Sequence, residues 1–301
     1  MKKNEVLGLI FLFICAVIWG SAFIFQEIAS EHISSFTFNF LRFGIASIVL
    51  LPFVIISLIK EKKKKGYINY KDIIIGSLLC GVTLSIASIT QQYGIGLSSA
   101  SKAGFITACY IVIVPIISLF LGKKNTLNIY LAVGLTLIGL YVFCINESFK
   151  LQLGDLLLII CAISFAFQII IVEKFSKKVN NLVLSFGQIF ISFIVCIIPC
   201  MVIDKPTISQ IGNGILPVLY VAIFSTCLCY TLQIVSQKNI NPTVASLIMS
   251  CESIFSAIFG FIILEQVLSN REIIGALIMI LGILLAQLPE KWFKFKKRNC
   301  K

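Results

Sequence analysis

Apolar stretches of about twenty residues recur along almost the whole chain and are separated by short polar breaks. A helix of that length crosses the roughly 30 Å hydrocarbon core of a membrane, because each residue adds about 1.5 Å. The longest polar break, around residues 60–71, is too short to form a soluble domain. The pattern predicts an all-α polytopic membrane protein with ten transmembrane helices, at residues 6–26, 35–58, 73–93, 99–121, 127–146, 154–173, 182–203, 215–236, 242–264 and 272–288.

The composition supports this fold class and excludes others. Of the 301 residues, 58% are hydrophobic and 13% are charged, whereas an ordinary soluble domain has roughly 45–50% and about 25%. The net charge is +12, but the basic residues lie in short loops and the tail rather than on one face, so we expect no nucleic-acid partner. Ten of the eleven cysteines lie inside apolar runs, so no disulfide framework is predicted.

The distribution of lysine and arginine predicts the orientation in the membrane. In the ten-helix topology twenty basic residues lie on one side and four on the other, namely Lys102, Lys150, Lys205 and Arg271, while Arg42 falls within the second span. Because positive loops stay in the cytoplasm, both termini are predicted to be cytoplasmic. Lysine supplies 22 of the 25 basic residues, which suits an AT-rich bacterial genome, so we expect a multi-pass protein of a bacterial cytoplasmic membrane.

The chain resembles itself when one half is laid on the other. A shift of 146 positions aligns the first span with the sixth, and a shift of 142 aligns the fourth with the ninth. The aligned pairs include Gly8 with Gly154, Cys15 with Cys161, Glu27 with Glu173, Gln91 with Gln233 and Cys109 with Cys251. This predicts two five-helix repeats, at 1–146 and 147–289, followed by a basic cytoplasmic tail at 290–301.

The odd number of helices in each repeat has a mechanical consequence. The second repeat must enter the membrane upside down relative to the first, which gives an inverted repeat. Two such halves can exchange conformations, so that a central site opens first to one side of the membrane and then to the other. The duplication therefore favours a transporter, although some channels share this symmetry.

Four stretches in this frame carry a family resemblance. They are residues 16–23 (AVIWGSAF), Leu41-Arg42-Phe43, residues 99–107 (SASKAGFIT) with Pro115, and residues 251–255 (CESIF) with Leu264-Glu265. In this order across both repeats they resemble the EamA family of the drug/metabolite transporter superfamily. The resemblance implies a ten-helix permease with cytoplasmic termini and a central cavity, which moves amino acids, sugars, nucleotide-linked metabolites or drugs. Gly122-Lys123 departs from the pattern, because the family often has Gly-Glu there.

Glu252 is the most informative polar residue within a predicted span. It lies near the middle of the ninth span, too deep for its short side chain to reach an interface. A carboxylate at that depth must be protonated, paired or turned toward a wet cavity. Glu252 is therefore either a proton-exchanging group or counter-ion for a substrate amine, or a structural tie between helices.

Two basic residues are further candidates for charge partners. Arg42 lies two turns inside the outer end of the second span, where it either snorkels outward, ties helices together or meets a substrate carboxylate. Lys102 lies at the outer mouth of the fourth span and could attract an anion. Glu27 and Glu173 lie at matching helix ends, where interfacial anchoring is the favoured interpretation.

The remaining candidates are amides and aromatic side chains. Gln91 and Gln233 occupy equivalent positions, which suits either a cavity lined from both halves or hydrogen bonds between packed helices. Trp19, Tyr110 and Tyr230 could form an aromatic wall for a flat or cationic substrate, or could simply pack. We expect the substrate site to be lined by Trp19, Gln91, Tyr110, Tyr230, Gln233 and Glu252, with Glu252, Arg42 and Lys102 as coupling or charge partners.

No enzymatic motif accompanies these residues. The single histidine, His32, has no metal-binding pattern around it, and the chain has no phosphate-binding glycine loop, so we expect no catalytic residues, metal or cofactor. The sequence predicts a secondary transporter that exports or exchanges a small metabolite, such as an amino acid or a drug-like amphipathic compound, by alternating access. A passive channel or a scaffold is the alternative, and an intramembrane enzyme is less favoured. The expected partners are the substrate and membrane lipids, and the protein is a monomer or a homodimer.

Overall fold

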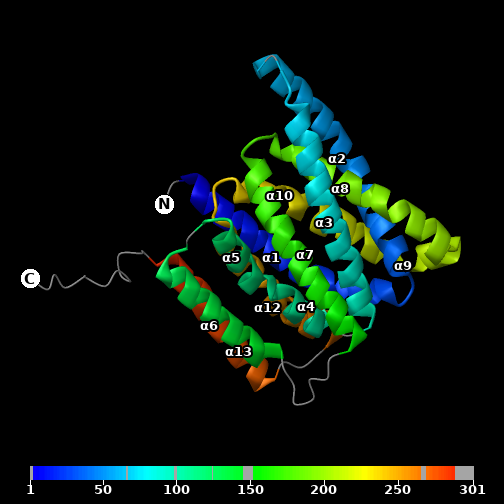
Figure 1. Ribbon diagram of the computed structural model, residues 1–301. Helices are drawn as coiled ribbons and strands as arrows, with labels where there is room; N and C mark the ends of the chain where they lie inside the picture. Colours follow the sequence, from blue (N-terminus) through cyan, green and yellow to red (C-terminus); the bar gives the residue numbers. More distant parts are fainter. Residues whose placement is uncertain are drawn as a thin grey trace, which may run out of the picture.

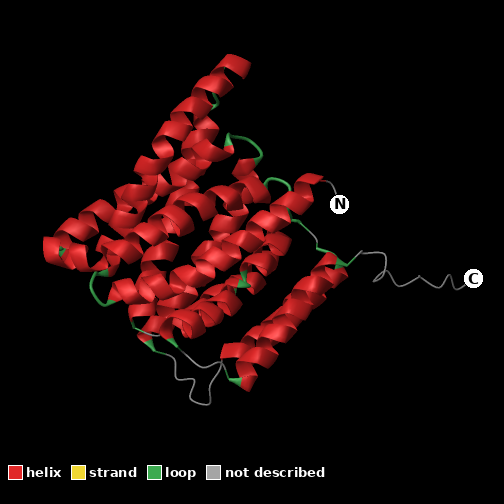
Figure 2. Ribbon diagram, turned by 180° about the vertical axis from the view of Figure 1, so that it is seen from behind, coloured by secondary structure: helices red, strands yellow, loops and turns green. Residues whose placement is uncertain are grey.

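The computed structural model describes residues 3–65, 67–97, 100–123, 125–144, 152–265 and 269–288. Every regular element in these ranges is helical (Figures 1 and 2). The first half of the chain contains α1 (Lys3–Ser30), α2 (Ser35–Lys65), α3 (Tyr70–Gly96), α4 (Ala100–Ala108), α5 (Tyr110–Phe120) and α6 (Leu127–Cys144). The second half contains α7 (Leu153–Ser176), α8 (Asn181–Pro199), η1 (Cys200–Asp204), α9 (Ile208–Tyr220), η2 (Val221–Cys229), α10 (Tyr230–Gln237), α11 (Pro242–Met249), α12 (Glu252–Leu264) and α13 (Asn270–Gln287).

Eight helical segments of the described chain are long and apolar enough to cross a membrane, which confirms an all-helical protein with multiple membrane-length helices. They cover eight of the ten predicted spans. The other two predicted spans, 127–146 and 272–288, correspond to α6 and α13, which lie side by side at one edge of the bundle (Figure 1). The membrane crossing of this last pair, and the side on which the termini lie, remain predictions. The predicted tail at 290–301 lies outside the described residues.

Corresponding helices of the two halves run in opposite directions. Near the end of α3, Gln92 donates a hydrogen bond to the Gln26 carbonyl near the end of α1, at 3.1 Å, so these two helices run in the same direction. Gly94 at the end of α3 lies against Leu158 near the start of α7, whereas Gly76 near the start of α3 lies against Phe175 near the end of α7. Hence α1 and α7, the first helices of the two halves, run in opposite directions (Figure 1).

Two predicted spans are broken at equivalent positions. The fourth span is divided at Cys109 into α4 and α5, and the ninth at Ser250 and Cys251 into α11 and α12. Around Cys109 and Cys251 the backbone switches to bonds between residues three apart, at 3.1 to 3.2 Å, which tightens the turn as in a 3₁₀-helix. Hydropathy does not reveal such a switch, because the side chains stay apolar through it.

Two prolines of the second half precede its π-helical segments. Pro199 ends α8 directly before η1, and Pro217 lies one turn before η2. Proline lacks the N–H that would bond the carbonyl four residues earlier, so the regular bonding pattern is interrupted there. The segment η2 brings a backbone carbonyl, that of Ser225, to the middle of the bundle, where it accepts a hydrogen bond from Trp19.

The start of α2 is fixed by a carboxylate from the other half of the chain. Asp204, at the end of η1, accepts hydrogen bonds from the Thr37 backbone N–H at 2.7 Å and from the Thr37 hydroxyl at 2.9 Å. The first turn of a helix has unsatisfied N–H groups and a partial positive charge, so a carboxylate stabilises it. This attachment holds the helix that carries Arg42.

Candidate functional site

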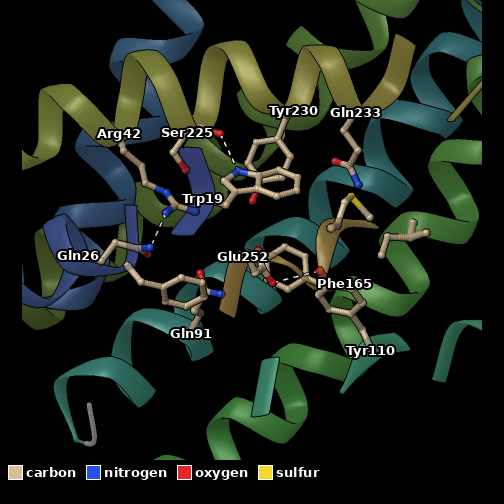
Figure 3. A pocket seen from close by; sticks show the side chains of 13 residues that line it. Trp19, Gln26, Arg42, Gln91, Tyr110, Phe165, Ser225, Tyr230, Gln233 and Glu252 are labelled. Carbon is tan, nitrogen blue, oxygen red and sulfur yellow. Dashed lines mark hydrogen bonds between the residues drawn. The ribbon is translucent and has the colours of Figure 1, made fainter. Parts of the chain in front are cut away.

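A cavity lies in the middle of the bundle and is lined by both halves of the chain (Figure 3). The first half contributes α1, α2, α3 and α5, and the second half contributes α7, η2, α10, α11 and α12. Its lining residues are Trp19, Phe23, Gln26, Arg42, Gln91, Tyr110, Phe165, Ile169, Ser225, Tyr230, Gln233, Met249 and Glu252. About 40 Å³ is open to the centres of water-sized molecules, which is room for a few waters.

The structure brings together all six residues that the sequence analysis assigned to the substrate site. Trp19, Gln91, Tyr110, Tyr230, Gln233 and Glu252 line this one cavity, and Arg42 lines it too. The third charge candidate, Lys102, belongs to α4, but its side chain lies outside the described residues. That these residues bind substrate remains a prediction.

Arg42 is turned into the protein, not toward the membrane surface. Only 2% of its surface is exposed, although it lies just two turns from the start of α2. Its Nη1 donates to Gln26 Oε1 at 3.3 Å, and its Nη2 donates to Ser88 Oγ at 2.7 Å. The guanidinium also stacks on Phe43, at 4.6 Å from the ring centroid. The interhelical tie is therefore present, and the outward snorkelling that the sequence left open is not what the structure shows.

Glu252 is the first residue of α12, directly after the break in the predicted ninth span. Its Oε1 accepts a hydrogen bond from the Tyr110 hydroxyl at 3.1 Å, and Tyr110 is the first residue of α5, directly after the equivalent break. Both side chains are buried. This hydrogen bond thus joins the broken helices of the two halves across the cavity (Figure 3).

The two buried charges of the cavity do not neutralise each other. Among the described residues, Arg42 and Glu252 form no ion pair, and their hydrogen-bond partners are the neutral groups Gln26, Ser88 and Tyr110. The Arg42 Nε is buried without a hydrogen-bond partner. A charge inside a membrane protein is costly unless it is paired or wetted, and such residues are typical of substrate or ion pathways. The cavity is therefore lined by a guanidinium and a carboxyl group that do not pair with each other.

Aromatic rings form one wall of the cavity. Trp19 and Tyr230 lie with their ring centroids 5.5 Å apart and their planes inclined by 53°. The Trp19 indole donates through Nε1 to the Ser225 carbonyl of η2 at 3.1 Å, which fixes the orientation of the ring. Phe165 completes the aromatic surface from α7 (Figure 3).

The two predicted glutamines have different surroundings. Gln233 exchanges hydrogen bonds with Gln168, at 3.1 and 3.5 Å, and Gln168 also donates to Gln188 at 3.0 Å. These buried amides tie α7, α8 and α10 together, so Gln233 serves the packing of the helices as well as lining the cavity. Gln91 lines the cavity from α3 and is 7% exposed.

Several lining residues were missed by the sequence analysis: Phe23, Gln26, Phe165, Ile169, Ser225 and Met249. The repeat itself contained the signal for one of them, Phe165, whose equivalent Trp19 was already a candidate. A shift of 146 positions lays Trp19 on Phe165 and Phe23 on Ile169. Gln26 and Ser225 could not be found in this way, because their role depends on Arg42 and on the π-helical segment.

Glu173 has an ion-paired environment at the end of α7. It accepts from Lys123 Nζ at 2.5 Å and from Lys177 Nζ, and its side chain is 8% exposed. The matching positions of Glu27 and Glu173 at helix ends predicted an interfacial anchor here. The Lys123–Glu173 pair connects the turn after α5 to α7 and thereby links the two halves of the chain at one end.

These observations define a helical membrane protein of two repeats with a charged cavity between them, which is the architecture of a membrane transporter. The profile of the EamA-like transporter family matches residues 6–145 and again residues 152–288. The chain belongs to the EamA-like transporter family, as the resemblance predicted.

Relatives with transporter names match along most of the chain. A protein of Archaeoglobus fulgidus named "Uncharacterized transporter" is 29% identical over 92% of this chain and 84% of its own length. The "Uncharacterized inner membrane transporter YedA" of Escherichia coli K12 is 21% identical over 95% of this chain and 92% of its own length. A solved structure titled "Crystal structure of protein" covers 96% of this chain and 99% of its own at 14% identity, with a TM-score of 0.76, and so shares the fold.

Proposed function

We propose that the protein is a secondary transporter of a bacterial cytoplasmic membrane, with both termini cytoplasmic, that exports or exchanges a small metabolite by alternating access. Amphoteric compounds such as amino acids are the first candidates for the substrate. The observation that carries this proposal is the pair of buried charges, Arg42 and Glu252, which line one cavity between the repeats and meet only neutral partners in the described chain.

The chemistry of the cavity supports a ligand with two charged ends. A guanidinium binds a carboxylate through two parallel hydrogen bonds, and the Nε of Arg42 is a buried donor that has no hydrogen-bond partner in the described chain. A carboxylate at Glu252 attracts an ammonium group. The rings of Trp19, Tyr230 and Phe165 supply an apolar surface for the rest of the molecule. An amino acid with an apolar side chain carries all three features, whereas a drug-like amphipathic amine carries two of them.

Two features of the structure support a cavity that changes shape. The open space is only enough for a few waters, so the cavity must widen before it admits a metabolite. The breaks before Tyr110 and Glu252 lie at equivalent positions in the two repeats and give each repeat a place to bend. Opposite bending of two oppositely directed halves is the motion that alternating access requires.

Rival functions make different predictions. A passive channel needs a continuous pore and would pass substrate without being accelerated by substrate on the opposite side. An intramembrane enzyme would alter its substrate chemically. We propose no catalytic residues and no cofactor, and a monomer suffices, since both halves of the cavity come from one chain.

The experiment is counterflow in proteoliposomes that contain the full chain. Vesicles are loaded with single unlabelled amino acids or amphipathic amines, and entry of the same labelled compound is followed by mass spectrometry. We expect counterflow for at least one amphoteric compound and a large loss of rate in Arg42→Gln and Glu252→Gln. Arg271→Gln and Glu272→Gln, which change the same residue types in α13 outside the cavity, serve as matched controls and should retain transport.

Two results would overturn parts of the proposal. Fluxes that do not respond to substrate on the opposite side would indicate a channel. Equal activity of the cavity variants and the α13 controls would remove Arg42 and Glu252 from the substrate site. Thermal unfolding of each variant in detergent separates a lost site from a lost fold.

A further inference from the structure

A second hollow lies at the opposite end of α2 from Arg42. It is a groove of about 560 Å³, bordered by Lys60, Lys64, Lys177, Lys178 and Lys238, with Glu61 as the single acid of its lining. Its described lining residues include none of those that line the central cavity. Like charges gathered around one hollow repel one another, so the groove favours an anionic occupant.

The walls of this basic groove are held in place by hydrogen bonds. Asn180, in the turn between α7 and α8, donates through Nδ2 to the Ser57 hydroxyl of α2 at 2.8 Å. The same Asn180 side chain accepts from the Leu182 backbone N–H at 3.0 Å and so caps α8. The spacing between the end of α2 and the turn before α8 is therefore set by specific contacts, and the lysines of both elements face a groove of fixed shape.

The groove lies where the apolar surface of α2 ends. Phe53 and Ile56 are 58% and 52% exposed, and they lie one helical turn before the groove residues Ser57 and Lys60, on the same side of α2. In a membrane, exposed apolar side chains of this kind contact acyl chains, whereas lysines extend toward the headgroups. A molecule with a phosphate in the groove would thus have its tails beside Phe53 and Ile56.

We propose that the basic groove binds the phosphate headgroup of an anionic phospholipid, with the acyl chains along the outer face of α2. Clusters of lysine at the end of membrane helices bind anionic lipid in this way. A soluble anion would use the lysines alone, whereas a lipid also uses the apolar surface that adjoins them. Because Lys60 and Lys64 belong to the first repeat and the other three lysines to the second, one headgroup would contact both repeats. The proposal does not depend on the transport function.

The test measures lipid binding to the purified full-length protein in a neutral detergent by native mass spectrometry. Phosphatidylglycerol is titrated against phosphatidylcholine of the same chain length, with glycerol phosphate as a soluble competitor. The groove variant is Lys60→Gln with Lys64→Gln, Lys178→Gln and Lys238→Gln. Lys177 stays unchanged, because it pairs with Glu173. The matched control is Lys62→Gln with Lys63→Gln, Lys71→Gln and Lys174→Gln, which removes the same charge from residues that do not line the groove.

We expect phosphatidylglycerol to bind in preference to phosphatidylcholine, and the groove variant to lose about tenfold or more in affinity while the control stays within about twofold. Equal loss in both variants would overturn the site, since it would reveal a diffuse charge effect. Competition by glycerol phosphate as strong as that by the lipid would overturn the lipid assignment. A photoactivatable phosphatidylglycerol on the unchanged protein gives a second test, which should label the peptides that carry Ser57–Lys64 and Lys177–Leu182 more than those of α6 and α13.

Discussion

The two repeats place equivalent residues around one cavity, yet they differ in the chemistry they supply. Trp19 and Phe165 are related by the shift of 146, and both line the cavity. Gln91 and Gln233 are related by the shift of 142 and also line it together. Duplication thus explains where the lining residues lie. It does not explain their charge.

The charges fall on opposite repeats. Arg42 comes from the first repeat, and the shift that lays the start of α2 on the start of α8 puts Gln188 at its equivalent position. Glu252 comes from the second repeat, and its equivalent is Tyr110. Each repeat therefore carries one ionisable residue whose equivalent in the other repeat is neutral, and the two residues are of opposite type. The symmetric frame thus has a polar axis, and we propose that this axis orients an amphoteric ligand in one direction.

The largest effect is expected when both charges are removed at once. The variant Arg42→Gln with Glu252→Gln makes the two repeats neutral at these positions, and we expect transport of an amphoteric substrate to fall by about 100-fold or more, since each charged hydrogen bond contributes about 1.5–3 kcal/mol. Initial counterflow rates in proteoliposomes measure this. A double variant that transports as fast as the unchanged protein would contradict the polar-axis interpretation.

The next prediction separates the two ends of the ligand. Arg42→Gln gives the first repeat the residue found at the equivalent position of the second, and should weaken binding of an amino acid by about tenfold or more. The same variant should affect the corresponding amino amide far less, because that compound has no carboxylate for Arg42 to bind. Apparent affinities of both compounds for both proteins form the test. An equal loss for acid and amide would show that Arg42 acts only as a tie between α1, α2 and α3.

The sequence was sufficient to predict the helices and the internal repeat, but not the interruptions within the helices. Hydropathy predicted where the helices lie, because membrane insertion depends on the average polarity of a segment. It placed Trp19 and Tyr230 inside spans, and the structure shows their rings 5.5 Å apart. The interruptions at Cys109 and Cys251 and the π-helical η2 were missed, since a change in backbone bonding leaves an apolar run apolar.

The direction of the Arg42 side chain was also beyond the sequence. A long basic side chain two turns from a helix end can reach either the interface or the interior. The choice depends on Gln26 and Ser88, which belong to α1 and α3 and whose distance from α2 no local pattern encodes. Tertiary packing therefore decided between alternatives that the sequence left open.

A smaller effect is expected at the hydrogen bond between Tyr110 and Glu252, which joins α5 of the first repeat to α12 of the second. Tyr110→Phe keeps the ring in place and removes only the hydroxyl that donates to Glu252. The lost bond corresponds to about 1–2 kcal/mol, so we expect a decrease in transport of about fivefold to thirtyfold with little change in apparent substrate affinity. Rates and affinities measured side by side distinguish this from loss of a binding group, which would change affinity first. Tyr93→Phe, on α3 outside the cavity lining, is the control for loss of a tyrosine hydroxyl.

The smallest effect is expected where the repeats already differ least. Trp19→Phe gives the first repeat the residue that the second has at the equivalent position, and it removes the indole donor to the Ser225 carbonyl. A neutral hydrogen bond contributes about 1 kcal/mol, so transport should fall by about fivefold or less. This holds if the ligand requires only one aromatic ring from each repeat, at positions 19 and 165. Trp19→Ala removes the ring as well and should cost clearly more in apparent affinity. Equal impairment of the phenylalanine and alanine variants would show that Trp19 acts through its indole N–H, which bonds η2, and not through its ring. The aromatic residues of the two repeats, Trp19 and Phe165, would then not be equivalent in function.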